Sequence, residues 1–203
     1  MSSKFVVVVC AAALSSVGLL SQTASATPNG GTCTLDGQAA FSTPLGATAH
    51  DFSYGFAGSL SNCQAGDAAS PSMPSGLTGK ISAGSPVTVG GVSYQEPKAT
   101  GNGSCGSSTT AGKALVQWSD GTTTVIDYTT TGAAAAVALK GVVVPSLVAT
   151  AADGTSVTFT TTRYLSDNVV GALAFEPPDP TACAGAGVAV AGIQGQTVLG
   201  SPS

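Results

Sequence analysis

The chain has few of the residues that most catalytic and nucleic-acid sites require. Of its 203 residues only six are lysine or arginine, ten are aspartate or glutamate, and one, His50, is histidine. A basic patch that could hold a phosphate backbone is missing, so nucleic acid is not an expected partner. No two cysteines lie within a few residues of each other and His50 has no second histidine beside it, which excludes the common spacings of a zinc site.

Motifs for catalysis are missing as well. The sequence has no Gly-x-Ser-x-Gly turn for a nucleophilic serine, no phosphate-binding glycine loop and no Asp-x-Asp-x-Asp-Gly loop for calcium. His50, beside Asp51, is the only imidazole that could act as a base. We interpret it as a loop or strand-edge residue hydrogen-bonded to its neighbours. The sequence therefore predicts no cofactor and no metal, and it favours a noncatalytic protein.

Two glutamates are the remaining candidates for an acid and a base. Glu96 and Glu176 each precede a proline, which favours the extended geometry found at strand ends. We expect both to be surface carboxylates. The alternative is an enzyme in which they act on a polysaccharide, because glycosidases use two carboxylates about 5 to 10 Å apart.

The N-terminus has the pattern of a secretory signal peptide. Lys4 precedes an apolar block over residues 5–20, and Ala24 and Ala26 supply the small residues that a signal peptidase requires. We predict a signal peptide over residues 1–26 and a single domain over residues 27–203. Loss of Lys4 leaves five basic and ten acidic residues, so the exported chain has a net charge of −5. The expected location is outside the cell or in the cell envelope.

The longest apolar run after the signal peptide, residues 132–152, does not fit a membrane span. Lys140 near its middle would cost about 2.5 to 3.5 kcal/mol in a bilayer, and Pro145 would break a helix. Two consecutive strands are the better interpretation, so no membrane-spanning segment is expected after cleavage.

Four cysteines remain once Cys10 is removed with the signal peptide. An even number in an exported domain indicates disulfides, and four cysteines allow three pairings. We predict the pairs Cys33–Cys63 and Cys105–Cys183, because joining neighbours along the chain requires the least threading among sequential strands.

Apolar and polar residues alternate with a period of two, and long stretches of helical periodicity are missing. Within residues 51–60, Phe52, Tyr54 and Phe56 share one face, which predicts a half-buried strand. Turn signals recur about every ten residues. The pattern favours an all-β fold, a sandwich or barrel of roughly eight to ten mostly antiparallel strands with two disulfides.

Three further segments are assigned from their composition. Residues 64–77 and 98–110 are expected to be long loops, and residues 187–199 are expected to form closing strands.

The clearest hairpin signal lies in residues 113–131. Asp120-Gly121 predicts a two-residue type I′ turn, which would place Val116 opposite Val125. The resulting apolar pairs fall on both faces of the hairpin. We therefore expect it to lie centrally in its sheet or to be covered on both sides.

A binding site would be signalled by aromatic residues, since flat rings stack on sugars. Trp118 is the only tryptophan and lies beside the predicted turn, while Tyr94 and Tyr128 lie near strand ends. These three are the candidate binding residues, although core packing is the simpler interpretation of Trp118.

Two stretches resemble small exported proteins of high-GC Gram-positive bacteria. They are residues 117–124, Gln-Trp-Ser-Asp-Gly-Thr-Thr-Thr, and residues 160–164, Thr-Thr-Thr-Arg-Tyr. The resemblance to these actinobacterial-type β proteins rests on strand and turn features, and it transfers no functional residue because the family has no known function.

Taken together, the residues favour an exported noncatalytic β domain with a binding or structural role at the envelope or outside the cell. Its partner is expected to be an unidentified carbohydrate or protein. The alternatives are the polysaccharide-acting enzyme, an inhibitor of extracellular enzymes and an outer-envelope pore.

Overall fold

The computed structural model describes residues 27–66 and 73–201, so the predicted signal peptide and part of the expected loop at residues 64–77 lie outside the described residues. The described chain forms thirteen strands and one short 3-10 helix. In chain order these are β1 (Thr27–Leu45), β2 (His50–Ala65), β3 (Gly79–Ala83), β4 (Pro86–Val89), β5 (Val92–Gln95), β6 (Ala99–Gly103), β7 (Ser107–Trp118), β8 (Thr123–Ala133), β9 (Ala136–Val144), β10 (Ser146–Ala151), β11 (Ser156–Thr160), β12 (Asn168–Glu176), η1 (Ala182–Ala184) and β13 (Val188–Ser201).

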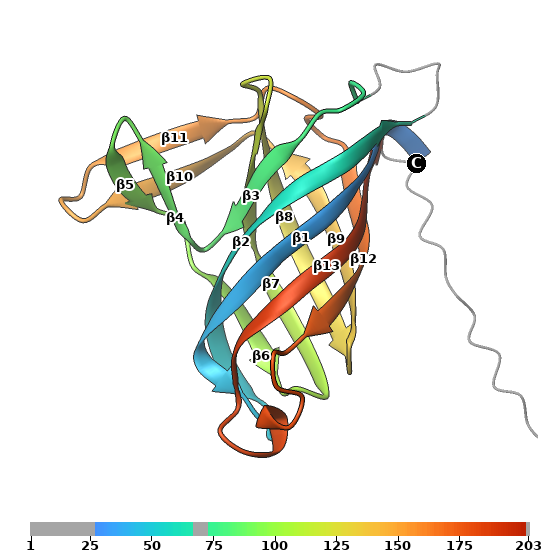
Figure 1. Ribbon diagram of the computed structural model, residues 1–203. Helices are drawn as coiled ribbons and strands as arrows, with labels where there is room; N and C mark the ends of the chain where they lie inside the picture. The colour runs from blue at the N-terminus through green and yellow to red at the C-terminus, as the bar shows by residue number, and fades with distance from the viewer. Residues whose placement is uncertain (1–26, 67–72, 202–203) are drawn as a thin grey trace, which may run out of the picture.

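The larger sheet closes into an eight-position barrel (Figure 1). Its order is β1-β13-β12-β9-β8-β7, and β2 completes the circle by pairing with β1. Between β7 and β2, strands β3 and β6 share one position, because each pairs with both neighbours over a different part of their length. All pairings are antiparallel. The all-β prediction is confirmed, and of its two forms the structure is the barrel.

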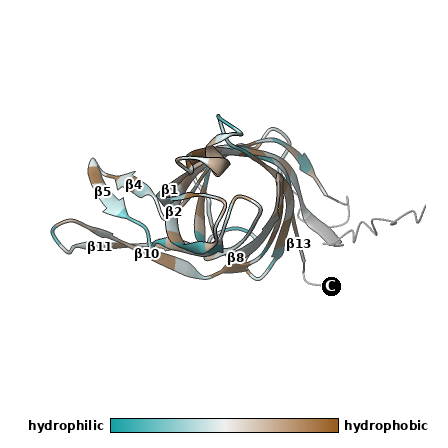
Figure 2. Cartoon of the chain, turned by 90° about the horizontal axis from the view of Figure 1, so that it is seen from below, coloured by the Kyte–Doolittle hydropathy of each residue, from teal (hydrophilic) through white to brown (hydrophobic). Residues whose placement is uncertain are grey.

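Alternation along the strands places the large apolar side chains inside the barrel. On β2, Phe52, Tyr54 and Phe56 face the interior and are buried, as the sequence predicts, whereas Ser53 and Ser59 face outward. Figure 2 shows the strands as a ring around the barrel axis. No helix in the described part of the chain is long and apolar enough to cross a membrane.

A second sheet of four strands, in the order β11-β10-β5-β4, lies beside the barrel (Figure 1). It packs on the outer wall at β7 and β8, where Leu115 and Val125 form a small second core with Leu147 and Ala149 of β10. The β7–β8 hairpin is therefore apolar on both faces because one face lines the barrel and the other supports this sheet. Both expected arrangements are found, because the hairpin lies inside the sheet order and is covered on both faces.

The predicted register of this hairpin is wrong by one residue. Leu115 pairs with Val125, and the loop has three residues because Trp118 N donates to the carbonyl of Thr122 at 2.9 Å. Asp120 sets this geometry, since its carboxylate accepts from both the backbone N and the hydroxyl of Thr122, leaving only Gly121 at positive φ. The turn is thus the three-residue form with a left-handed glycine.

Other segments are close to expectation. Residues 132–152 contain β9 and β10, as predicted, and the C-terminal segment forms β13, a single strand that pairs with β1 and β12. The prediction of a long loop at residues 98–110 is wrong, because β6 and the start of β7 pair there.

Both predicted disulfides are present, Cys33–Cys63 and Cys105–Cys183. The first joins β1 to β2 inside the end of the barrel that is at the top in Figure 1, called the upper end below. Strict alternation from Leu60 would turn Cys63 outward, but Asn62 adopts a positive φ of 49° at a register shift, and this bulge turns Cys63 inward. The second ties the loop between β6 and β7 to η1 at the lower end (Figure 1).

Candidate functional site

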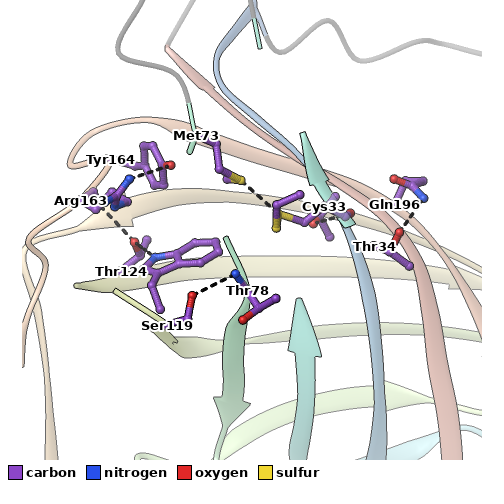
Figure 3. The surroundings of a disulfide bond; sticks show 12 residues. Cys33, Thr34, Met73, Thr78, Ser119, Thr124, Arg163, Tyr164 and Gln196 are labelled. Carbon is purple, nitrogen blue, oxygen red and sulfur yellow. Dashed lines mark hydrogen bonds between the residues drawn. A yellow bond between two sulfur atoms is a disulfide. The ribbon is translucent and has the colours of Figure 1, made fainter. Parts of the chain in front are cut away.

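Trp118, the first of the candidate binding residues, is part of the core at the upper end of the barrel. It is only 4% exposed, and its Nε1 donates to the Thr124 hydroxyl at 2.9 Å. The hydroxyl of Thr124 in turn donates to the Arg163 carbonyl. Around it, Met73 Sδ lies 3.2 Å from Cys33 Sγ, which places sulfur and aromatic groups together at this end (Figure 3).

The other two candidate aromatics lie elsewhere. Tyr128 is buried inside the barrel, and Tyr94 packs in the second core beneath the small sheet. Trp118, Tyr94 and Tyr128 therefore do not form one exposed surface on which a sugar ring could stack.

The lower half of the barrel is hollow. A cavity of about 120 Å³ lies inside it, bounded almost wholly by apolar side chains from β1, β2, β3, β7, β8, β9, β12 and β13. Its deep part is lined by Leu35, Phe56, Ile81 and Ile126, and its lower part by Phe41, Val137, Leu139 and Phe175. Eight-stranded barrels are just wide enough either to be filled by side chains or to hold one small ligand.

Glycines in the wall explain why the aromatic rings do not fill this space. A Cβ on Gly37 would lie 2.6 Å from the ring of Phe56, and one on Gly101 would lie 2.5 Å from the ring of Phe52. Each ring therefore occupies the space that a side chain at the glycine would fill, and packs against the backbone of a neighbouring strand.

The cavity opens toward the lower end. Phe41, Val137, Phe175 and Ile193 face the interior, yet each is only partly buried. Inward-facing apolar side chains retain exposure only where solvent reaches the interior. The upper end is closed by buried side chains, including Met73, Trp118 and Leu199.

One polar feature crosses the cavity wall, a chain of four hydroxyl groups. Tyr128 and Tyr54 are joined by a hydrogen bond of 2.6 Å, Tyr54 and Thr110 by one of 3.0 Å, and Thr110 and Thr130 by one of 2.7 Å. Burial raises the pKa of both tyrosines, so they stay protonated and neutral. These four hydroxyl groups therefore offer hydrogen bonds but no charge.

The two glutamates do not form a pair. The expectation that Glu96 is a surface carboxylate is wrong, because its side chain is 1% exposed and accepts hydrogen bonds from the Ser82 hydroxyl at 2.6 Å and from Ser85 N at 3.2 Å. Burial raises the pKa of Glu96. Glu176 is exposed and accepts from Gln194. It lies at the end of β12, four strand positions away from β3 and β6 in either direction around the barrel.

His50 lies at the lower end of β2. Its Nδ1 is 3.1 Å from the Thr48 carbonyl, which agrees with the interpretation of a histidine bonded to its neighbours. Over residues 27–66 and 73–201, no group of three or more histidine, cysteine, aspartate or glutamate side chains is arranged to hold a metal.

Comparison of the chain with protein-family models, with curated proteins and with solved structures found no match. Sequence reasoning missed the cavity, although a signal for it exists: threonines and glycines stand at alternate positions of β7 and β8, in phase with Ile126 and Tyr128 on the inward face.

Proposed function

We propose that this protein is an extracellular, noncatalytic binding protein that holds one small apolar molecule inside the lower half of its barrel. The observation that carries the proposal is the apolar cavity with partly exposed side chains at its lower end. An empty apolar surface in contact with water is costly, at about 25 cal/mol per Å², and a ligand that covers it recovers this free energy. The two disulfides are compatible with the extracellular location that the predicted signal peptide implies.

Several features favour a small apolar ligand over the carbohydrate or protein partner considered from the sequence. The only tryptophan is buried, so it does not offer a stacking platform for a sugar. The outward face of β2 carries short side chains, whereas its large aromatic rings point inward. The greatest gain in buried apolar area is therefore inside the barrel.

Titration with toluene, followed by NMR of the backbone amides, tests the proposal. The expected result is saturable shifts on β1, β8 and β9 around the cavity. An apolar cavity of about 150 Å³ holds one benzene molecule, so a single ring is the appropriate probe size.

A matched pair of variants on β1 provides the control. Ala39 is 3% exposed and lines the cavity, whereas the adjacent Ala40 is exposed on the outer wall. Ala39→Leu should weaken toluene binding at least about tenfold because its side chain occupies the ligand's space, and Ala40→Leu should leave it unchanged. The proposal fails if toluene produces no saturable shifts, or if Ala39→Leu binds toluene as well as the wild type does.

A further inference from the structure

The chain of four hydroxyls contains one more proton than it can use internally. Each hydroxyl group has a single proton to donate, and the four groups are joined by three hydrogen bonds. Whichever way the three bonds run, one of the four protons has no acceptor among these hydroxyl groups. Within the described residues, neither end hydroxyl, Tyr128 or Thr130, makes another hydrogen bond to the protein.

The two ends differ in access. The Tyr128 side chain is 7% exposed, and its hydroxyl lies against β7, since a Cβ on Gly112 would be 3.1 Å from it. Thr130 is only partly buried, as is Thr110. The Thr110–Thr130 end therefore has room for an acceptor that comes from outside the protein.

The lack of charged side chains in the described cavity lining limits the ligand to neutral molecules. The described residues that line the cavity include no lysine, arginine, histidine, aspartate or glutamate. A carboxylate or an ammonium group placed there would lose its hydration without gaining a partner of opposite charge, which is costly. The cavity therefore suits a neutral molecule.

We infer, on the basis of the proposed function, that the ligand class is a small neutral molecule of about one ring that carries a single oxygen acceptor, such as a ketone or an ether. Its oxygen accepts a hydrogen bond from the Thr110–Thr130 end of the hydroxyl chain. Its apolar body lies deeper, against Leu35, Phe56 and Ile126.

Two probes of nearly the same shape separate the hydrogen bond from the apolar contact. Cyclohexanone and methylenecyclohexane differ in having oxygen or CH₂ at one position. The quantity to measure is the ratio of their dissociation constants, because the hydrocarbon is less soluble in water and absolute affinities are not comparable.

The variants are matched cross-strand pairs on β7 and β8. Thr110 and Thr130 face each other inside the barrel, and Thr109 and Thr131 face each other on its outer wall. In Thr110→Val/Thr130→Val, cyclohexanone should lose about five- to tenfold relative to methylenecyclohexane, the value of one net hydrogen bond. In Thr109→Val/Thr131→Val, the ratio should remain that of the wild type.

The outcomes distinguish the two proposals. If both probes bind and the inner pair of substitutions leaves their ratio unchanged, the hydrogen-bonding inference is overturned while the apolar-binding function stands. If neither probe binds the wild-type protein, the proposed function itself is overturned. A folding defect in the inner variant would appear as loss of methylenecyclohexane binding, and then Thr130→Val alone provides the ratio.

Discussion

The two ends of the barrel are formed by the same strands, but the upper end is filled and the lower half is hollow. On β8, Thr124 and Thr130 both face inward. Thr124 is fully buried and bonded to Trp118, whereas Thr130 is partly exposed at the end of the hydroxyl chain. The comparison teaches that ring placement, more than residue type, determines where this barrel has room.

The disulfides should give the largest effects, and they differ between the ends. In the chain-entropy model the separations of 30 and 78 residues correspond to about 3.6 and 4.5 kcal/mol of unfolding free energy. Replacing each pair by alanine and measuring urea unfolding tests both values. A loss of less than about 1 kcal/mol for either bond would contradict the model.

Accessibility adds a second distinction. Cys33 and Cys63 are 0% and 4% exposed, whereas Cys105 and Cys183 are partly exposed. Under native conditions dithiothreitol should therefore reduce Cys105–Cys183 first, as mass spectrometry of alkylated peptides would show. Reduction of Cys33–Cys63 first would mean that the upper end opens more readily than its packing indicates.

A pair of leucines tests whether the lower half is hollow. Leu199 is 1% exposed at the filled end, and Leu139 is partly exposed on the cavity wall. Leu199→Ala should cost about 3 to 4 kcal/mol, because it leaves a new cavity in close-packed surroundings. Leu139→Ala should cost about 1 to 2 kcal/mol, since that side chain already faces open space and has fewer contacts to lose. Equal losses in denaturant unfolding would indicate that the two ends are packed alike.

Periodicity in the sequence is enough to identify faces, but it does not identify closure. The shared face of Phe52, Tyr54 and Phe56 is correct because alternation is a local property of a strand. Which strands meet is a long-range property, so neither the barrel nor the cavity follows from that pattern. The Cys63 side chain also depends on a bulge at Asn62, and the turn at Asp120 on a side-chain hydrogen bond that shifts the register by one residue.

Glu96 is a second case in which the local prediction is correct but the long-range packing could not be predicted. Its position before Pro97 is correctly interpreted as a strand end, between β5 and β6. Its burial follows from β4 and β5 forming part of the small sheet beside the barrel wall, with Ser82 of β3 supplying one hydrogen-bond donor. No local feature of residues 92–99 records that covering.

The last prediction concerns the buried carboxylate of Glu96, which is not part of the cavity lining at the lower end of the barrel. Because burial raises the pKa of Glu96 in the fold above its ordinary value of 4.5, the folded state favours the protonated form. This contribution to stability is fully present below the unfolded pKa and is lost as the pH rises through the folded pKa. The wild type should therefore lose unfolding free energy between pH 4 and pH 7 relative to Glu96→Gln, at no more than about 1.4 kcal/mol per pH unit.

Gln fits the site, since its oxygen can accept from Ser85 N while the Ser82 hydroxyl turns to accept from its amide. Glu176→Gln, on the far side of the barrel, is the matched control for removal of one carboxylate. Urea unfolding at both pH values gives the comparison, and toluene binding should be the same in Glu96→Gln as in the wild type, because Glu96 does not line the cavity.

If the Glu96→Gln curve runs parallel to that of the wild type across this range, burial of the carboxylate does not affect its protonation. If the variant instead loses toluene binding, the Glu96 contact outside the barrel affects the cavity. Side-chain packing inside the barrel would then not be enough to explain why the lower half is hollow and the upper end is filled.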